Sequence, residues 1–113
     1  MTSSCFDRKP PATHFVVARS DLPRGVLLAQ VVHAAGESAS PMPPSGTHAV
    51  VLGVPDERSL LRVADKLARR GIAFNLICES DPPWRNAAMA IGLPPTRDRR
   101  AINRVLGRLP LLE

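Results

Sequence analysis

The chain has 113 residues, 44% of them hydrophobic, and carries a formal net charge of +5. This length fits one domain that buries about two-thirds of its unfolded surface, and no apolar run approaches the roughly 20 residues of a transmembrane helix. Arginine supplies 13 of the 15 basic residues, so we expect an anionic partner, nucleic acid first, with a merely solvated surface as the alternative.

Residues 1–12 predict a disordered tail, and residues 13–113 predict a single domain. The tail lacks the apolar core of a signal peptide, so the simplest location is cytoplasmic. Cys5 lies in this tail and Cys78 in a predicted strand, which makes a structural disulfide unexpected.

The first half of the domain predicts two strands around one helix. His14–Arg19 is a short apolar run typical of a buried strand. Pro23 and Gly25 then precede a helix over about 24–37. Residues 36–46 are rich in proline and glycine and predict a loop, and 47–54 predict the second strand.

The second half begins with a helix capped by Asp56 and closed by Gly71, with an apolar face that includes Leu60, Val63 and Leu67. Strands are then predicted over 72–78 and 87–93, joined by a turn at 79–85, and Thr96 is expected to cap a last helix ending near Leu106. The order β-α-β-α-β-β-α predicts an α/β three-layer sandwich around a four-stranded mixed sheet, with mostly parallel crossovers and one antiparallel pair.

Three segments resemble the type 2 peptidyl-tRNA hydrolases. Arg19–Ala34 reads Arg-x-Asp-Leu-x-x-Gly-x-x-x-Ala-Gln-x-x-His-Ala, like the opening motif of that family. Val54–Glu57 resembles the start of its second helix, and Ile91–Pro95 its closing strand. The resemblance covers about residues 14–112 in one unbroken order. It implies tRNA or peptidyl-tRNA as partner, no cofactor, and hydrolysis of the ester that joins a peptide to the 3′ ribose of tRNA.

The chain departs from the family pattern at several positions. Val26 stands where the family usually has lysine, and Ala87 and Met89 where it carries threonines. The segment 79–85 is shorter than its family counterpart and resembles a bacterial and phage branch. These departures leave open a catalytically silent member that binds RNA or a protein. A partner-binding adaptor is a third reading, supported by the proline-rich loop 40–46.

Polar side chains are expected to meet beyond the carboxyl ends of the strands, where ligands bind in such sheets. His33 or Asp81 could orient the attacking water there, and Arg24 could replace the missing lysine as a cation. The predicted catalytic residues are His33, Asp21 and Asp81, and the predicted substrate-binding residues are Arg24, Gln30, Glu79 and Trp84.

Each of these residues also has a structural reading. Gln30, His33 and Glu37 share one helix face, so His33 could be a core histidine bonded to Glu37. Asp21 could cap the first helix. Glu79 and Asp81 could serve the turn, and Trp84 could be a hydrophobic plug instead of a stacking platform for a base.

Basic residues gather on the second and last helices, where a tRNA backbone or a solvated surface could explain them. The predicted nucleic-acid contacts are Arg58, Arg62, Lys66, Arg69, Arg97, Arg100 and Arg104. His14, His33 and His48 have no metal-ligand spacing, so no metal site is predicted. The sequence leaves the oligomeric state open between a monomer and a homodimer.

Overall fold

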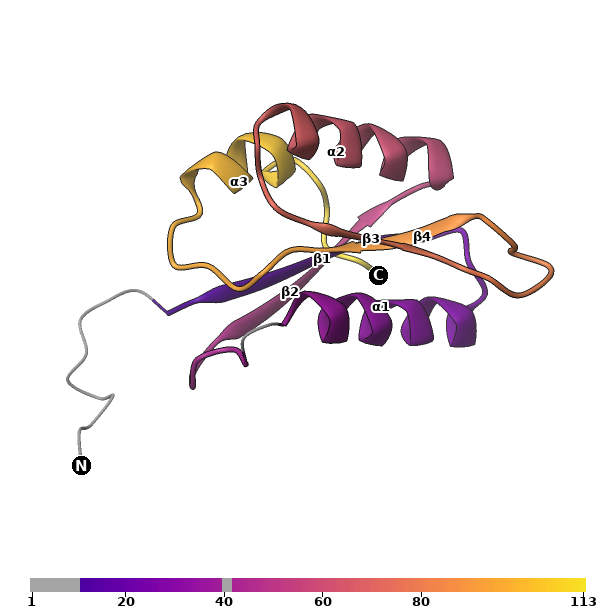
Figure 1. The fold of residues 1–113 in the computed structure, drawn as a ribbon, viewed down its shortest axis with the longest axis horizontal. Helices are drawn as coiled ribbons and strands as arrows, with labels where there is room; N and C mark the ends of the chain where they lie inside the picture. Colours follow the sequence, from indigo (N-terminus) through magenta and orange to yellow (C-terminus); the bar gives the residue numbers. More distant parts are fainter. Residues whose placement is uncertain (1–10, 40–41) are drawn as a thin grey trace.

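The computed structural model describes residues 11–39 and 42–113, which form a four-stranded sheet between two helical layers. The elements are β1 (Thr13–Arg19), α1 (Arg24–Ser38), β2 (His48–Val54), α2 (Glu57–Arg69), β3 (Asn75–Cys78), β4 (Ala88–Gly92) and α3 (Arg100–Leu106). Helix α1 covers one face of the sheet, whereas α2 and α3 cover the other (Figure 1). The predicted class and element order are confirmed.

The strand order is β2-β1-β4-β3, which places β1 inside the sheet. All seven residues of β1 are buried, as expected for a strand covered on both faces. β1 and β2 run parallel, but β4 lies between β1 and β3 and is antiparallel to both. The sheet therefore has one parallel and two antiparallel pairs, which corrects the expectation of mostly parallel pairing. The short 79–87 connection reverses the chain, and β4 then takes the inner position.

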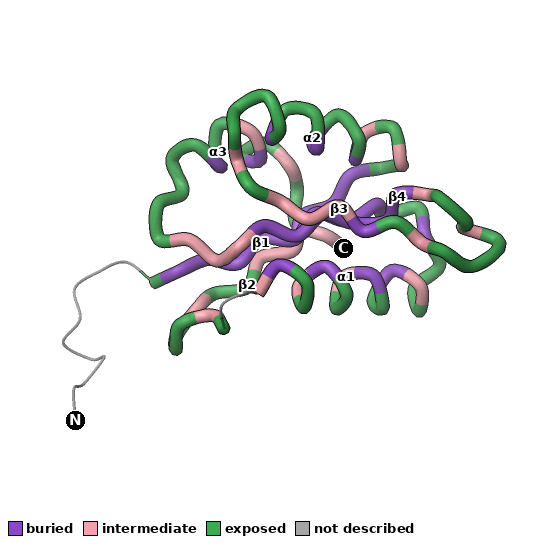
Figure 2. The backbone as a smooth tube through the Cα atoms, in the orientation of Figure 1, coloured by how far each residue is buried: buried purple, intermediate pink, exposed green. Residues whose placement is uncertain are grey.

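Two apolar clusters hold the layers together. One lies between the sheet and helices α2 and α3, and the other between the sheet and α1. Figure 2 shows the buried face of each helix turned toward the sheet. Leu60 and Leu67 of α2 are fully buried, and each contributes about 2 kcal/mol through the apolar surface that it removes from water.

Several predicted boundaries are wrong. β3 begins at Asn75 and not at 72, because the chain leaves α2 through Gly71, whose φ is +69°, and needs three more residues to reach the sheet. Thr96 does not cap the last helix; its hydroxyl and the backbone of Asp98 form a local turn, and α3 begins at Arg100. Ala12, assigned to the tail, is buried, and its carbonyl accepts a hydrogen bond from His48.

Residues 1–10 of the predicted tail, including Cys5, and residues 40–41 of the proline-rich loop lie outside the described residues. Cys78 carries a free, exposed thiol. Within the described ranges, no helix has the length and apolar character to cross a membrane.

The segment 109–113 follows α3 and lies along the outer edge of β2. The Gly53 amide donates to the Pro110 carbonyl at 2.8 Å, and the Leu112 amide donates to the Val51 carbonyl at 3.0 Å. These bonds satisfy backbone groups that an exposed edge strand would otherwise present to other chains. They also fix this segment beside the start of α2.

Candidate active site

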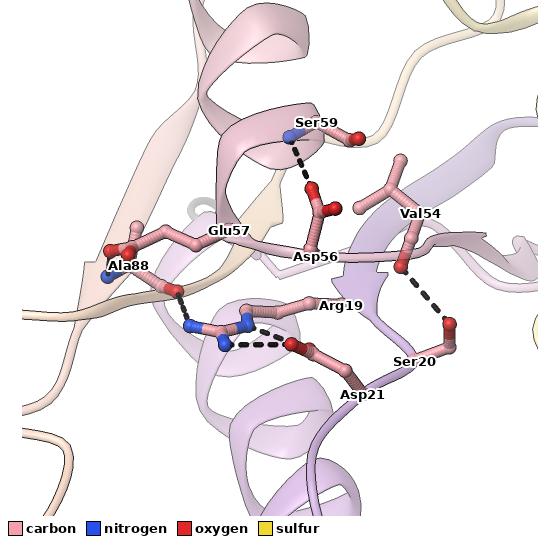
Figure 3. Close-up of polar contacts among 8 residues, drawn as sticks. All are labelled: Arg19, Ser20, Asp21, Val54, Asp56, Glu57, Ser59 and Ala88. Carbon is pink, nitrogen blue, oxygen red and sulfur yellow. Dashed lines mark hydrogen bonds and ion pairs between the residues drawn. The ribbon is translucent and has the colours of Figure 1, made fainter.

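Arg19 organises the polar groups at the carboxyl end of β1 (Figure 3). Its Nε and one terminal nitrogen donate to the two carboxylate oxygens of Asp21 at 2.8 and 2.9 Å. The other terminal nitrogen donates to the Ala88 carbonyl of β4 at 3.1 Å. This fork-to-fork geometry is the strong form of an arginine–carboxylate pair. It lets a buried guanidinium keep its charge and fixes both oxygens of Asp21.

The start of α2 brings two more carboxylates to this place. Asp56 caps α2 by accepting a hydrogen bond from the Ser59 amide at 2.8 Å, as predicted. Glu57 accepts from the Ala88 amide at 2.7 Å. Ala88 is thus held on both sides, through its carbonyl by Arg19 and through its amide by Glu57. We call Arg19, Asp21, Asp56 and Glu57 the polar cluster.

Hydrogen bonding sets the charge of this cluster. The Arg19 guanidinium holds the pKa of Asp21 below its usual value, and the Ser59 backbone amide lowers the pKa of Asp56. Asp21 in turn raises the pKa of Arg19. At neutral pH the cluster therefore presents the Asp21 carboxylate, which remains partly exposed to solvent.

Helix α1 begins beside Asp21 without a side-chain cap. Its N-cap is Pro23, and its first turn contains no acidic residue. The alternative that Asp21 caps this helix is therefore wrong, since its carboxylate is turned to Arg19. Unpaired first-turn amides and the helix dipole make such a terminus favourable for an anion. Arg24 is exposed at this end, whereas Val26 packs partly against the α1-side core.

A second polar contact joins α1 to the turn after β3. The buried Gln30 donates through Nε2 to Glu79 at 2.9 Å. The other oxygen of Glu79 accepts from the amides of Ser80 and Asp81 at 2.8 and 3.2 Å. Both amides lower the pKa of Glu79, and the Asp81 amide has the largest effect. Gln30 Oε1 is buried and has no hydrogen-bond partner. The contact thus shapes the turn that carries Asp81 and Trp84.

His33 makes none of these hydrogen bonds, although it contributes, after the two amides and Gln30, to the lowered pKa of Glu79. Its ring is 53% exposed and pairs with Glu37 at 2.6 Å, one turn along α1. The alternative reading of His33 as a core histidine is therefore wrong, because the ring is exposed, but the predicted pairing with Glu37 is confirmed. Among the hydrogen bonds and ion pairs of residues 11–39 and 42–113, none joins His33 to Asp21 or Asp81. The predicted site residues fall into three contacts, Arg19–Asp21, Gln30–Glu79 and His33–Glu37, while the exposed Arg24 and Asp81 side chains make none of these bonds.

Trp84 covers the polar cluster from the β3–β4 turn. The Arg19 guanidinium lies 5.7 Å from the centre of the indole ring, within the range of a cation–π interaction. The side chain is half-buried and packs against the α1-side core. This packing supports the reading of Trp84 as a hydrophobic plug.

The residues predicted to contact nucleic acid are all exposed. Arg69 pairs with Asp65 of the same helix at 3.0 Å. In the part of the chain that the structure describes, no group of histidine, cysteine, aspartate and glutamate side chains is arranged to hold a metal ion.

Sequence reasoning left out Arg19 as a site residue. The available signal was a charged side chain ending an otherwise apolar strand, two residues before an aspartate.

Comparison with protein families identifies a family for this chain. The family model described as Peptidyl-tRNA hydrolase PTH2 matches residues 13–112, which include every element of the fold. No curated protein matches the chain.

Proposed function

This chain belongs to the peptidyl-tRNA hydrolase PTH2 family, and from that premise we propose that it hydrolyses the ester joining a peptide, or a related acyl group, to the 3′ ribose of tRNA. The observation that carries the proposal is the Asp21 carboxylate, locked by Arg19 beside the uncapped start of α1. A fixed acceptor next to an anion-binding helix end is what hydrolysis of an ester requires. A role in translation and a cytoplasmic location go with this proposal.

In the proposed reaction, Asp21 accepts a hydrogen bond from a water molecule and aims its oxygen at the ester carbonyl. The water oxygen bonds to the carbonyl carbon, and the bond from that carbon to the ribose oxygen breaks. One water proton reaches the ribose oxygen, so the products are a free carboxylate, a proton and tRNA with a free 3′ hydroxyl. The lowered pKa of Asp21 makes it a weak base, so its main contribution is orientation.

The developing oxyanion needs donors on the other side of the carbonyl. We assign this role to the first-turn amides of α1 together with Arg24, which brings a cation to the position served by the family's lysine. Asp81 and His33 are the other groups that we propose for water orientation. Gln30, Glu79 and Trp84 would frame the substrate on the α1 side.

Arg24→Ala tests the cationic role, measured as the initial rate of N-acetyl-aminoacyl-tRNA hydrolysis. Loss of one oxyanion donor should lower kcat by about 10²-fold, and Val26→Lys should raise the rate by restoring a cation to the same helix turn. Arg85→Ala is the matched control, because Arg85 is an exposed arginine on the β3–β4 turn; its rate should stay within about twofold of the parent.

The assay also decides between hydrolysis and the alternative of a catalytically silent member that binds RNA or a protein. A folded parent and a folded Val26→Lys variant that both leave the ester intact would overturn the hydrolase proposal. The retained Arg19–Asp21 pair would then serve only to fix β4 and α1.

We also propose a second copy of this chain as a partner of α1. Leu28 and Val32 lie on the outer face of that helix with 57% and 71% of their surfaces exposed. Ala29, between them in the chain, is also exposed. An exposed apolar stripe on a helix is typical of an interface.

A further inference from the structure

A groove opens beside the polar cluster, between α2 and the segment that follows α3. Its volume is about 710 Å³. Ser20 and Ser59 line one end of it. Ser20 directly follows Arg19, and the Ser59 amide is held by Asp56, so this end of the groove lies at the candidate site (Figure 3).

The walls of the groove differ in chemistry. One wall is α2, which contributes Val63 and the cationic side chains of Arg62 and Lys66. The opposite wall is the segment 109–113, whose first four residues are apolar and include the exposed Leu111, and whose last residue, Glu113, adds one carboxylate against the two cations of α2. Because backbone bonds to β2 hold this segment in place, the groove exists before any ligand arrives. It suits a ligand with a flat apolar part and an anionic part.

The groove continues into a basic surface. Lys66 also lines two further depressions, of about 410 and 630 Å³, between α2 and α3. Their other cationic lining residues are Arg69, Arg70, Arg104 and Arg108, and no carboxylate lines either depression. A track that begins in a partly apolar groove beside the candidate site and becomes increasingly cationic toward α3 matches a terminal nucleoside followed by a phosphodiester chain.

We propose that this groove binds the 3′-terminal nucleoside of the tRNA acceptor strand, and that the preceding phosphates follow the Lys66–Arg104 surface. This inference rests on the proposed hydrolase function and specifies how the substrate is oriented across the site. The nucleic acid lies on the α2/α3 side of the polar cluster, and the peptide leaves toward Trp84 and α1. A peptide in the groove is the competing assignment. A peptide is less complementary to this surface, because it has no regular series of negative charges to pair with the cations on α2 and α3.

The test uses the full chain and a short single-stranded RNA ending in CCA, with binding measured by fluorescence anisotropy across a salt series. Lys66→Ala and Arg104→Ala should each lower the log–log salt slope by about 0.7, the value for one phosphate contact on a single strand. Arg85→Ala removes the same charge outside the groove and its depressions, so its slope should equal that of the parent.

A second variant tests the apolar wall. RNA that lacks the terminal adenosine should bind the parent about fivefold more weakly, because the base then no longer covers the apolar wall; this factor corresponds to about 40 Å² of apolar surface at about 25 cal/mol per Å². In Leu111→Ala this difference should nearly vanish; the side chain is largely exposed, and its removal leaves the backbone bonds of the segment intact.

Unchanged salt slopes in Lys66→Ala and Arg104→Ala would overturn the groove assignment, as would displacement of the RNA by an N-acetylated tripeptide. These outcomes are separable from the hydrolase proposal. If the protein hydrolyses the ester but RNA does not bind in the groove, only the groove assignment is rejected. If RNA binds in the groove but the ester stays intact, only the hydrolase proposal is rejected.

Discussion

A buried arginine has to be matched by acceptors, because an unpaired charge inside a protein is strongly destabilising. Arg19 meets this demand with two carboxylate oxygens and one backbone carbonyl, and it places the Trp84 ring over its face. One side chain thus joins the end of β1, the entry to α1, the start of β4 and the β3–β4 turn. Its role is to position Asp21 as well as to stabilise the fold.

Arg19→Lys tests the stabilising role, because lysine keeps the positive charge and loses the planar fork. We expect the free energy of unfolding to fall by about 2 kcal/mol, the value of one or two hydrogen bonds to charged groups. Urea denaturation measures this change, and Arg85→Lys on the exposed turn should stay within about 0.5 kcal/mol of the parent.

The Arg19→Lys effect should also depend on pH in a defined direction. The folded pKa of Asp21 lies below its ordinary value of 3.8. The stability from the pair is therefore present above that value and is lost as pH falls through the lower, folded pKa. Equal stability of parent and variant at neutral pH would contradict the stabilising role of the pair.

The sequence showed which polar residues lie near the strand ends, but not how they pair. Gln30, His33 and Glu37 share a helical spacing, yet Gln30 is buried against the turn while His33 and Glu37 are exposed. Spacing fixes the angles between side chains on a helix, whereas the rotation of the helix on the sheet depends on tertiary packing. For the same reason, Asp21 could be placed at the site from the sequence while its pairing with Arg19 could not.

At the scale of elements, the strongest local signals gave correct predictions. The apolar face of α2 and its Asp56 cap are confirmed, because periodicity and capping are local properties. The inner position of β4 and the pairing of segment 109–113 with β2 depend on long-range contacts. A segment with only two backbone bonds to the sheet leaves no periodic pattern for sequence analysis to detect.

The packing of α1 on β4 depends on Gly92. A Cβ atom at this position would fall on the Ala34 carbonyl oxygen and the Ser38 side chain. Ser38 cannot easily move, because its hydroxyl bonds both the Ala34 carbonyl, at 2.7 Å, and His14, at 2.8 Å. The close approach of helix backbone to strand therefore requires glycine.

Gly92→Ala should lower the free energy of unfolding by about 1–3 kcal/mol, the usual cost of overpacking a core. The matched control is Gly36→Ala, because Gly36 lies in α1 with no atom near its Cβ position. That change should stabilise the protein by about 0.5–1 kcal/mol. Thermal or urea unfolding of both variants measures the difference, and equal stabilities would show that α1 shifts freely on the sheet.

At the scale of the whole molecule, the charge and the apolar surface are divided between faces. The basic depressions lie over α2 and α3, while the exposed stripe Leu28–Ala29–Val32 lies on α1 at the opposite face of the sheet (Figure 1). An RNA and a second copy of the chain could therefore bind at the same time.

In the proposed dimer, two copies of α1 pack antiparallel about a twofold axis near the middle of the helix, with the stripe Leu28–Ala29–Val32 at the contact. Gly25 and Gly36 are exposed near the two ends of α1, and small residues let helices approach closely.

Leu28→Glu should therefore convert a dimer into a monomer, because two carboxylates would enter an apolar contact near its own axis. Sedimentation equilibrium or light scattering across a concentration series measures the change. Leu61→Glu is the matched control, since Leu61 is an exposed leucine on α2, with 44% of its surface accessible, on the other face of the sheet. The control should keep the assembly state and the unfolding midpoint of the parent, because Leu61 does not belong to the buried core. A parent that is monomeric at all concentrations would overturn the α1 interface, and so would a dimer unaffected by Leu28→Glu.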